Sequence, residues 1–195
     1  MKVVTLMTTY NRNGNTRKIV DRLTTGIKDA EGSNEILYMG DYNIGFCTGC
    51  GTCKSGGGCV LDDDYNKLLD KIRQADYFIF SAPIYYGDLA AQSKVFIDRL
   101  GSIGNDENLE MKEKKTMIIL THLSSTINDF VIENTHRGIV TANFKVNKIL
   151  DIGDLLLRTV DKYTEDELEG FEDIGYELED YEVIPHKLDL ENNTL

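Results

Sequence analysis

All four cysteines of the 195-residue chain fall between residues 47 and 59, as Cys47, Cys50, Cys53 and Cys59. Their spacing is C-x2-C-x2-C-x5-C. Two-residue gaps allow a short loop to turn successive thiolates toward one object, and 4Fe–4S clusters are held by cysteine runs of this type. Glycines at positions 49, 51 and 56–58 allow positive φ angles and close backbone approach. The stretch therefore predicts a 4Fe–4S cluster with these cysteines as its ligands.

Two other uses of the same cysteines remain open. Zinc is also held by four thiolates, but usually by two separated C-x2-C pairs, whereas three of these cysteines crowd into seven residues. Free or redox-active thiols without a metal are the second alternative. Disulfides are disfavoured, because the short run 1–7 is not a secretory signal and such bonds persist mainly in oxidising compartments.

A second candidate site lies in the polar stretch from Thr9 to Thr16, between an apolar run and a helical pattern. Backbone N–H groups and the positive end of a helix dipole at such a position attract anions. The hydroxyls of Thr9 and Thr16 and the amide of Asn15 add donors suited to a phosphate. Neither the P-loop pattern nor G-x-G-x-x-G is present. We interpret the loop as a phosphate site of another kind, with a simple capping turn as the alternative.

A third candidate follows the third expected strand and consists of Pro83, Ile84, Tyr85, Tyr86, Gly87 and Asp88. Backbone polar groups at the end of a strand can hydrogen-bond the edge of a planar ring while a tyrosine shields one of its faces. Rim packing of the two tyrosines is the alternative. His122 and Ser124 follow the fourth strand, where a histidine is more often incidental than a cofactor contact.

Alternating apolar patterns show how these loops are positioned. Short apolar runs predict strands over 2–8, 35–39, 76–82, 115–121 and 144–152. Helical spacing predicts one helix that begins at residue 16 and two more over 62–75 and 89–100. A further helix is expected to begin at the capping box of residues 164–167. The stretch 124–142 suggests a helix, although its β-branched residues weaken that interpretation. This alternation is typical of a parallel sheet covered on both faces, which binds ligands outside the carboxyl ends of its strands.

Composition narrows the class of protein. A formal net charge of −12 and a pI of about 4.7 argue against nucleic acid or an anionic membrane surface as partner. No apolar run approaches the ~20 residues of a membrane span, so we expect a cytoplasmic protein. We expect one domain over 1–180 that carries the cysteine loop, and a tail over 181–195 that packs on a neighbour.

Three patterns carry a family resemblance. Gly14-Asn15-Thr16, with Thr9 upstream, resembles a G-S-P-R-x-x-G-N-T loop; Pro83-Ile84-Tyr85 resembles a P-[IV]-Y flavin loop; and Lys94, Ile97, Asp98 and Arg99 match K-x-x-I-D-R. Over about residues 1 to 155 the chain resembles the flavodoxin-like NADPH-dependent FMN reductase superfamily, and its cysteine run resembles that of the iron–sulfur flavoproteins. Tyr10, Asn11 and Thr8 depart from the loop pattern. Asn11 stands where the family pattern has arginine. The loss of that arginine implies weaker FMN binding, or a phosphate contact from Arg12 in its place.

The resemblance implies a flavodoxin-like, doubly wound, five-stranded parallel sheet of order 2-1-3-4-5 in a three-layer α/β/α arrangement. It implies FMN at the strand ends, touching residues of the 9–16 and 83–88 loops, and a 4Fe–4S cluster in the cysteine loop at the same edge. NAD(P)H or a redox protein would be the electron donor, and a homodimer or homotetramer the assembly. An electron carrier without turnover of its own, and a cluster-free flavoprotein, are the alternatives.

Overall fold

Five parallel strands form the centre of the computed structural model, which describes residues 1–103, 111 and 114–185. They are β1 (Lys2–Met7), β2 (Ser33–Tyr38), β3 (Tyr77–Tyr85), β5 (Lys115–Thr121) and β6 (Lys145–Ile152). Their order is β2-β1-β3-β5-β6, which is the expected 2-1-3-4-5 order once the short strand β4 (Asp88–Leu89) is set aside. Strand β4 pairs antiparallel with β3 and was not expected from the sequence. The predicted flavodoxin-like sheet is confirmed.

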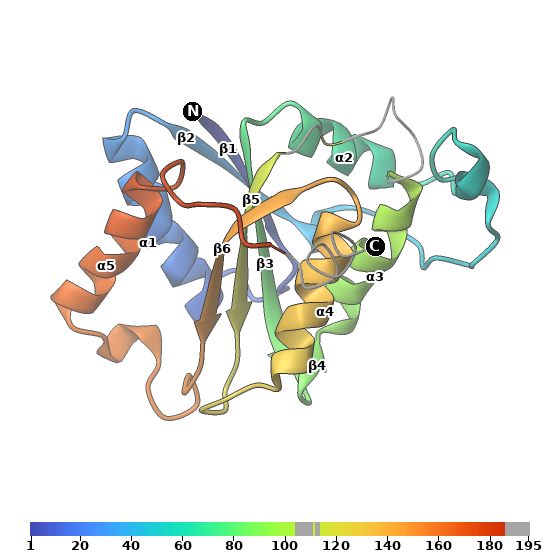
Figure 1. Cartoon of the computed structure of the whole chain (residues 1–195). Helices are drawn as coiled ribbons and strands as arrows, with labels where there is room; N and C mark the ends of the chain where they lie inside the picture. Colours follow the sequence, from blue (N-terminus) through green and yellow to red (C-terminus); the bar gives the residue numbers. More distant parts are fainter. Residues whose placement is uncertain (104–110, 112–113, 186–195) are drawn as a thin grey trace, which may run out of the picture.

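Helices cover both faces of this sheet (Figure 1). One face carries α1 (Asn15–Asp29) and α5 (Glu165–Tyr176), and the other carries α2 (Tyr65–Arg73), α3 (Ala91–Arg99) and α4 (Asp129–Val140). Two separate apolar clusters fill the spaces between the layers, one on each side of the strands. The strands are apolar on both faces because both are buried, which explains why their sequences read as continuous runs.

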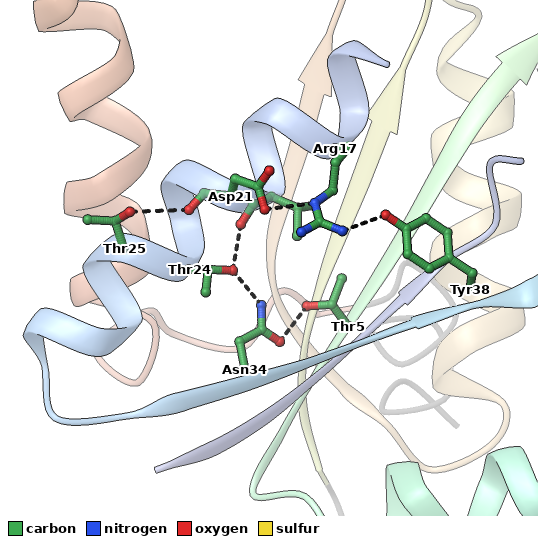
Figure 2. A network of polar contacts seen from close by, with 8 residues as sticks. Thr5, Arg17, Asp21, Thr24, Thr25, Asn34 and Tyr38 are labelled. Carbon is green, nitrogen blue, oxygen red and sulfur yellow. Dashed lines mark hydrogen bonds and ion pairs between the residues drawn. The ribbon is translucent and has the colours of Figure 1, made fainter. Parts of the chain in front are cut away.

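A chain of polar contacts docks α1 onto the edge of the sheet, through Thr5, Arg17, Asp21, Thr24, Thr25, Asn34 and Tyr38 (Figure 2). The side chain of Asn34 on β2 donates to Thr24 Oγ1 (2.8 Å) and accepts from Thr5 Oγ1 (2.9 Å). Arg17 Nη1 donates to the Tyr38 hydroxyl at 2.6 Å. These contacts fix the helix relative to β1 and β2, and with it the loop that enters the helix.

The backbones of α1 and α5 approach closely at two glycines. A Cβ atom on Gly26 would lie 1.8 Å from the carbonyl oxygen of Glu172, and one on Gly175 would lie 2.1 Å from that of Leu23. Glycine is therefore required at both positions. The predicted capping box at the start of α5 is confirmed, with Thr164 and Glu167 bonding each other's backbone N–H.

Helix α4 forms within the stretch whose β-branched residues weakened the prediction. Its N-cap is Asn128, whose Oδ1 accepts the Phe130 N–H at 2.9 Å. Val131, Thr135 and Ile139 lie on one buried face, so packing against the sheet outweighs the modest propensity penalty.

Residues 181–185, the part of the C-terminal tail that the structure describes, pack on their own chain, and packing of the tail on a neighbour stays a prediction. The Ile184 N–H donates to the Val146 carbonyl at 2.7 Å, and Lys148 Nζ lies 3.9 Å from the centre of the Tyr181 ring. This segment covers the exposed edge of β6, where unpaired backbone groups favour aggregation. Within the described residues, no helix is both long and apolar enough to cross a membrane.

Candidate functional site

The loop after β1 begins between β3 and α3. The Thr8 N–H donates to the Ser81 carbonyl at 2.9 Å, and the Thr8 hydroxyl lies 3.0 Å from the same oxygen and 2.6 Å from Ser93 Oγ. Thr8 is fully buried, and these contacts satisfy its hydroxyl. Thr8 stands where the G-S-P-R-x-x-G-N-T pattern has its first glycine, and polar partners on β3 and α3 accommodate the larger side chain.

The loop itself is held by its own polar side chains. Thr9 Oγ1 accepts the Asn11 N–H at 3.1 Å, and Asn11 Oδ1 accepts the Asn13 N–H at 3.1 Å. The loop is therefore preformed, which reduces the ordering cost of binding a ligand there. Both residues were predicted as cofactor contacts, and the structure places them in the turn that leads to α1.

The first turn of α1 contacts two other elements. Thr16 Oγ1 lies 2.8 Å from Thr121 Oγ1 at the end of β5, and Asn15 Oδ1 accepts the Val160 N–H at 3.2 Å. Because the oxygen of Asn15 is engaged, its NH2 group is the part left to contact a ligand. The first turn contains no acidic residue. The positive end of the helix dipole is therefore not neutralised within its own turn.

Arg12 lies outside this turn. Its guanidinium forms an ion pair with Asp41, just after β2, and stands 4.3 Å from the centre of the Tyr38 ring. A phosphate contact from Arg12, in place of the family's arginine, would require release from Asp41.

The stretch after the third strand is a β-hairpin, which corrects the prediction that the strand ends before Pro83. Strand β3 continues to Tyr85 and turns through Tyr86 and Gly87 into β4. Both turn residues have positive φ angles, 51° for Tyr86 and 83° for Gly87, as two-residue type I′ hairpins require. Pro83 and Ile84 are buried, and Tyr85 and Tyr86 face outward, with Tyr86 fully exposed. Asp88 Oδ1 accepts the Leu89 N–H at 2.7 Å.

His122 is a buried structural residue. Its Nε2 lies 2.7 Å from Asp151 Oδ1, its Nδ1 lies 3.3 Å from Ser124 Oγ, and a Cβ on Gly153 would lie 2.5 Å from its ring. The histidine thus joins the ends of β5 and β6. This arrangement supports the interpretation of His122 as incidental to cofactor binding.

The cysteine loop extends from the body of the protein beside α2 and α3, as the cyan and teal segment of Figure 1. Its four free thiols line one pocket of about 60 Å³, together with Arg99, Gly101 and Ser102 at the end of α3. The positive φ angles expected for the glycines of this loop are present at all five of them, Gly49, Gly51, Gly56, Gly57 and Gly58. Within the described residues, no three His, Cys, Asp or Glu side chains converge closely enough to hold a metal ion. The predicted ligands surround one space but are not assembled into a coordination group.

A buried ion pair closes the base of this loop. Asp63 pairs with Arg99, and its carboxylate accepts the Gly45 N–H at 2.9 Å and the Tyr65 N–H at 3.1 Å. Burial disfavours the charged carboxylate, but these hydrogen bonds prevail and lower the pKa of Asp63. Burial likewise opposes the charge on Arg99, yet the bond to Asp63 and the nearby Cys59 sulfur raise its pKa. From the sequence, Asp63 falls at the start of the helix expected over 62–75, and Arg99 is only part of the K-x-x-I-D-R match, so neither residue is linked to the cysteines.

The β3–β4 hairpin and the cysteine loop lie at opposite ends of α3 (Figure 1), which corrects the expectation that they share one edge. The hairpin leads directly into the first turn of the helix, and the pocket is lined by residues 98–102 at its other end. A nine-residue helix separates them by about 13 Å at 1.5 Å per residue. The strand order alone did not predict this, because the cysteine loop runs away from the end of β2.

Comparison with known proteins identifies related sequences. Residues 1–129 match the sequence model described as NADPH-dependent FMN reductase. An iron-sulfur flavoprotein of Archaeoglobus fulgidus is 31% identical over 119 residues, which cover 61% of this chain and 54% of the relative. A second, from Methanocaldococcus jannaschii, is 32% identical over 99 residues, 51% of each chain. The chain thus spans about half the length of the curated relatives it matches.

Solved structures support the fold. The NAD(P)H:quinone oxidoreductase of Methanothermobacter marburgensis superposes with a TM-score of 0.68 at 16% identity, covering 92% of this chain and 97% of that one. Oxidised flavodoxin 1 of Bacillus cereus gives 0.61 at 15% identity, covering 92% and 98%. At these identities the likeness concerns the fold alone.

Proposed function

Because this chain belongs to the NADPH-dependent FMN reductase family, we propose that it is an FMN-dependent oxidoreductase that passes electrons from a reduced nicotinamide nucleotide to an acceptor. The observation that carries the proposal is the convergence of the loops after β1, β3 and β5. Thr8, at the start of the loop after β1, contacts Ser81 within β3 and Ser93 on α3, the helix that the β3–β4 hairpin leads into, and Thr16 contacts Thr121 at the end of β5.

The FMN phosphate binds at the start of α1. Backbone N–H groups of the first turn, the NH2 group of Asn15 and the hydroxyls of Thr9 and Thr16 supply donors, and the helix dipole favours the negative charge. The preformed turn of Thr9 and Asn11 supports this assignment.

The flavin ring binds against the β3–β4 hairpin. The backbone of residues 83–88 offers polar groups to the ring edge, and Tyr85, which is half exposed, shields one face from water. Bound FMN would supply transfer of either one or two electrons. The hairpin residues orient the ring and limit access of solvent to it.

We also propose that Cys47, Cys50, Cys53 and Cys59 hold a 4Fe–4S cluster. Four thiols around one pocket, a run of positive-φ glycines and a buried arginine beside them suit an anionic cluster held by cysteines. The cluster would supply one-electron transfer. A homodimer or homotetramer, and NAD(P)H or a redox protein as donor, complete the proposal.

The test is purification without oxygen, followed by absorption spectroscopy and analysis of flavin, iron and sulfide. We expect a yellow-brown protein that releases FMN on heat denaturation and oxidises NADH or NADPH with a quinone or free flavin as acceptor. A colourless protein that fails to bind added FMN at micromolar concentration would reject the flavin assignment. FMN binding without NAD(P)H oxidation would favour an electron carrier, and one zinc per chain would reject the cluster.

A further inference from the structure

Arg99 is the most deeply buried cation near the cysteine pocket, with 2% of its surface exposed. Its Nη1 pairs with Asp63 and donates to the Gly45 carbonyl at 3.3 Å. Its guanidinium also lies over the Tyr65 ring, 4.2 Å from the ring centre. Gly45 and Asp63 flank the cysteine run, so Nη1 contacts both ends of the loop, which also meet where the Asp63 carboxylate accepts the Gly45 N–H.

The other side of the guanidinium faces the Cys59 thiol, which raises the pKa of Arg99, but it makes no hydrogen bond of ordinary geometry within the described residues. Among the residues that the structure describes, Nε and Nη2 of Arg99 are buried and have no hydrogen-bond partner. Arginine has five N–H donors, so three of them are unsatisfied. Buried donors without an acceptor are costly, and a charged group more so. An acceptor at this position would therefore be strongly favoured.

The surroundings indicate what that acceptor is. Arg99 lines the same pocket as the four thiols, and the half-buried Cys59 packs against the apolar cluster that includes α3. One carboxylate, Asp63, already balances the charge of Arg99, so a further acceptor there is not needed for neutrality alone. Sulfur atoms of a cluster accept hydrogen bonds, and such bonds together with the local charge set its reduction potential.

We propose that Arg99 is a positioning residue of the cysteine site, which clamps the loop through Nη1 and directs Nε and Nη2 at the sulfur atoms of the bound cluster. The inference rests on the cluster of the proposed function. Three N–H donors beside the cluster stabilise its reduced, more negative state. Lysine could not replace this residue fully, because its single ammonium group cannot span Asp63, Gly45 and the pocket at once.

The experiment compares wild-type protein with Arg99→Gln, Arg99→Lys and Arg137→Gln after anaerobic reconstitution with iron and sulfide. Arg137 lies on the surface of α4, so its substitution changes net charge equally without touching the pocket. Iron per chain, bound FMN, thermal melting and the midpoint potential of the cluster are measured. We expect Arg99→Gln to lower the equilibrium constant for reduction of the cluster at least tenfold, which is about 59 mV for a one-electron couple. Arg137→Gln should leave it unchanged.

Arg99→Lys keeps the charge and serves as the deciding variant if Arg99→Gln does not fold. We expect its potential to fall between those of wild-type protein and Arg99→Gln, with faster loss of iron. If Arg99 only holds the two ends of the loop together, its substitution would change iron retention but not the midpoint potential of the cluster. Equal potentials in all four proteins, or an Arg99→Lys protein identical to wild type, would overturn the inference while leaving the cluster in place. Wild-type protein that binds FMN but no iron would overturn both the cluster and this inference.

Discussion

The side-chain oxygen of Asn15 accepts a hydrogen bond from the Val160 N–H at 3.2 Å, across 145 residues of sequence. This contact joins the first residue of α1 to the turn that precedes α5. It also sets the orientation of the carboxamide, because the oxygen must face Val160 and the NH2 group must face the other way. Asn15 therefore enters the proposed phosphate site with a donor in a fixed direction.

The first prediction concerns Asn15→Asp, which keeps the shape of the side chain and replaces the NH2 donor with a negatively charged carboxylate oxygen. Asn15→Asp should keep the Val160 contact, since a carboxylate also accepts an N–H, but should place a negative charge beside the FMN phosphate. Two unit charges about 4 Å apart cost about 4 kcal/mol at an effective dielectric constant of ~20. The helix dipole offsets part of this. We expect the dissociation constant of FMN to rise by about one to three orders of magnitude.

Titration of FMN by quenching of its fluorescence checks this prediction, with iron content and thermal melting measured in parallel. The matched control is Asn66→Asp, which makes the same change on the exposed surface of α2. Both variants should fold, because Asp is as acceptable as Asn near a helix start. If Asn15→Asp binds FMN as wild type does, Asn15 does not face the phosphate.

The second prediction separates the two cofactor sites. Cys50→Ser should lower the iron content of anaerobically prepared protein, because serine is a poor substitute for a thiolate ligand, and should leave FMN bound. The cysteine pocket and the flavin-loop hairpin lie at opposite ends of α3, so loss of one site need not disturb the other. Iron and flavin are measured on the same sample. Unchanged iron would remove Cys50 from the ligand set.

The central strands were predictable because burial on both faces leaves an unmistakable apolar run. The sequence of β3 is apolar to its end, and its length was underestimated only because Pro83 was interpreted as a stop. Pro83 remains inside the strand, where its carbonyl still accepts the Ala90 N–H at 3.1 Å. The hairpin could not be predicted, because Tyr86 adopts a positive φ angle that tyrosine rarely takes.

The local motifs of the candidate sites could be predicted from the sequence, but the contacts that distant residues make with them could not. Cysteine spacing indicated a shared pocket, but a local motif cannot tell which distant residue closes it. Arg99 lies 36 residues from its partner Asp63, and nothing in the K-x-x-I-D-R pattern links it to the cysteines. The same limit applies to Asn15 and Val160, whose contact depends on how α5 packs against α1.

The third prediction concerns that packing. Gly26→Ala should destabilise the fold, because the new Cβ would lie 1.8 Å from the Glu172 carbonyl oxygen and only a backbone shift could relieve the overlap. Overpacking of this kind typically costs about 1–3 kcal/mol. Gly170→Ala is the control on α5, where an added Cβ meets no atom within 4 Å. There the higher helix propensity of alanine should stabilise the protein by up to about 1 kcal/mol. Urea unfolding measures both, and equal effects of the same sign would contradict the close approach of the two helices.

The last prediction uses the pH dependence of the α5 cap. Glu167 binds Arg158 through both carboxylate oxygens and accepts the Thr164 N–H at 2.8 Å. The bonds from Arg158, then that from Thr164, lower the pKa of Glu167 to about 2, from an ordinary value of 4.5. A carboxyl with a lowered pKa stabilises the folded state above its ordinary pKa, and this stabilisation is lost as pH falls toward the folded value.

Glu167→Gln should therefore lower the melting temperature at pH 7, because glutamine can still cap Thr164 but cannot pair with Arg158. The gap from wild type should shrink between pH 4.5 and about 2, as the wild-type carboxylate takes up its proton. Melting temperatures at several pH values in this window check the prediction. Glu169→Gln removes a carboxylate from the same helix without disturbing the cap. A gap that stays constant down to pH 2, or one that Glu169→Gln reproduces, would show that the Glu167–Arg158 pair does not stabilise α5.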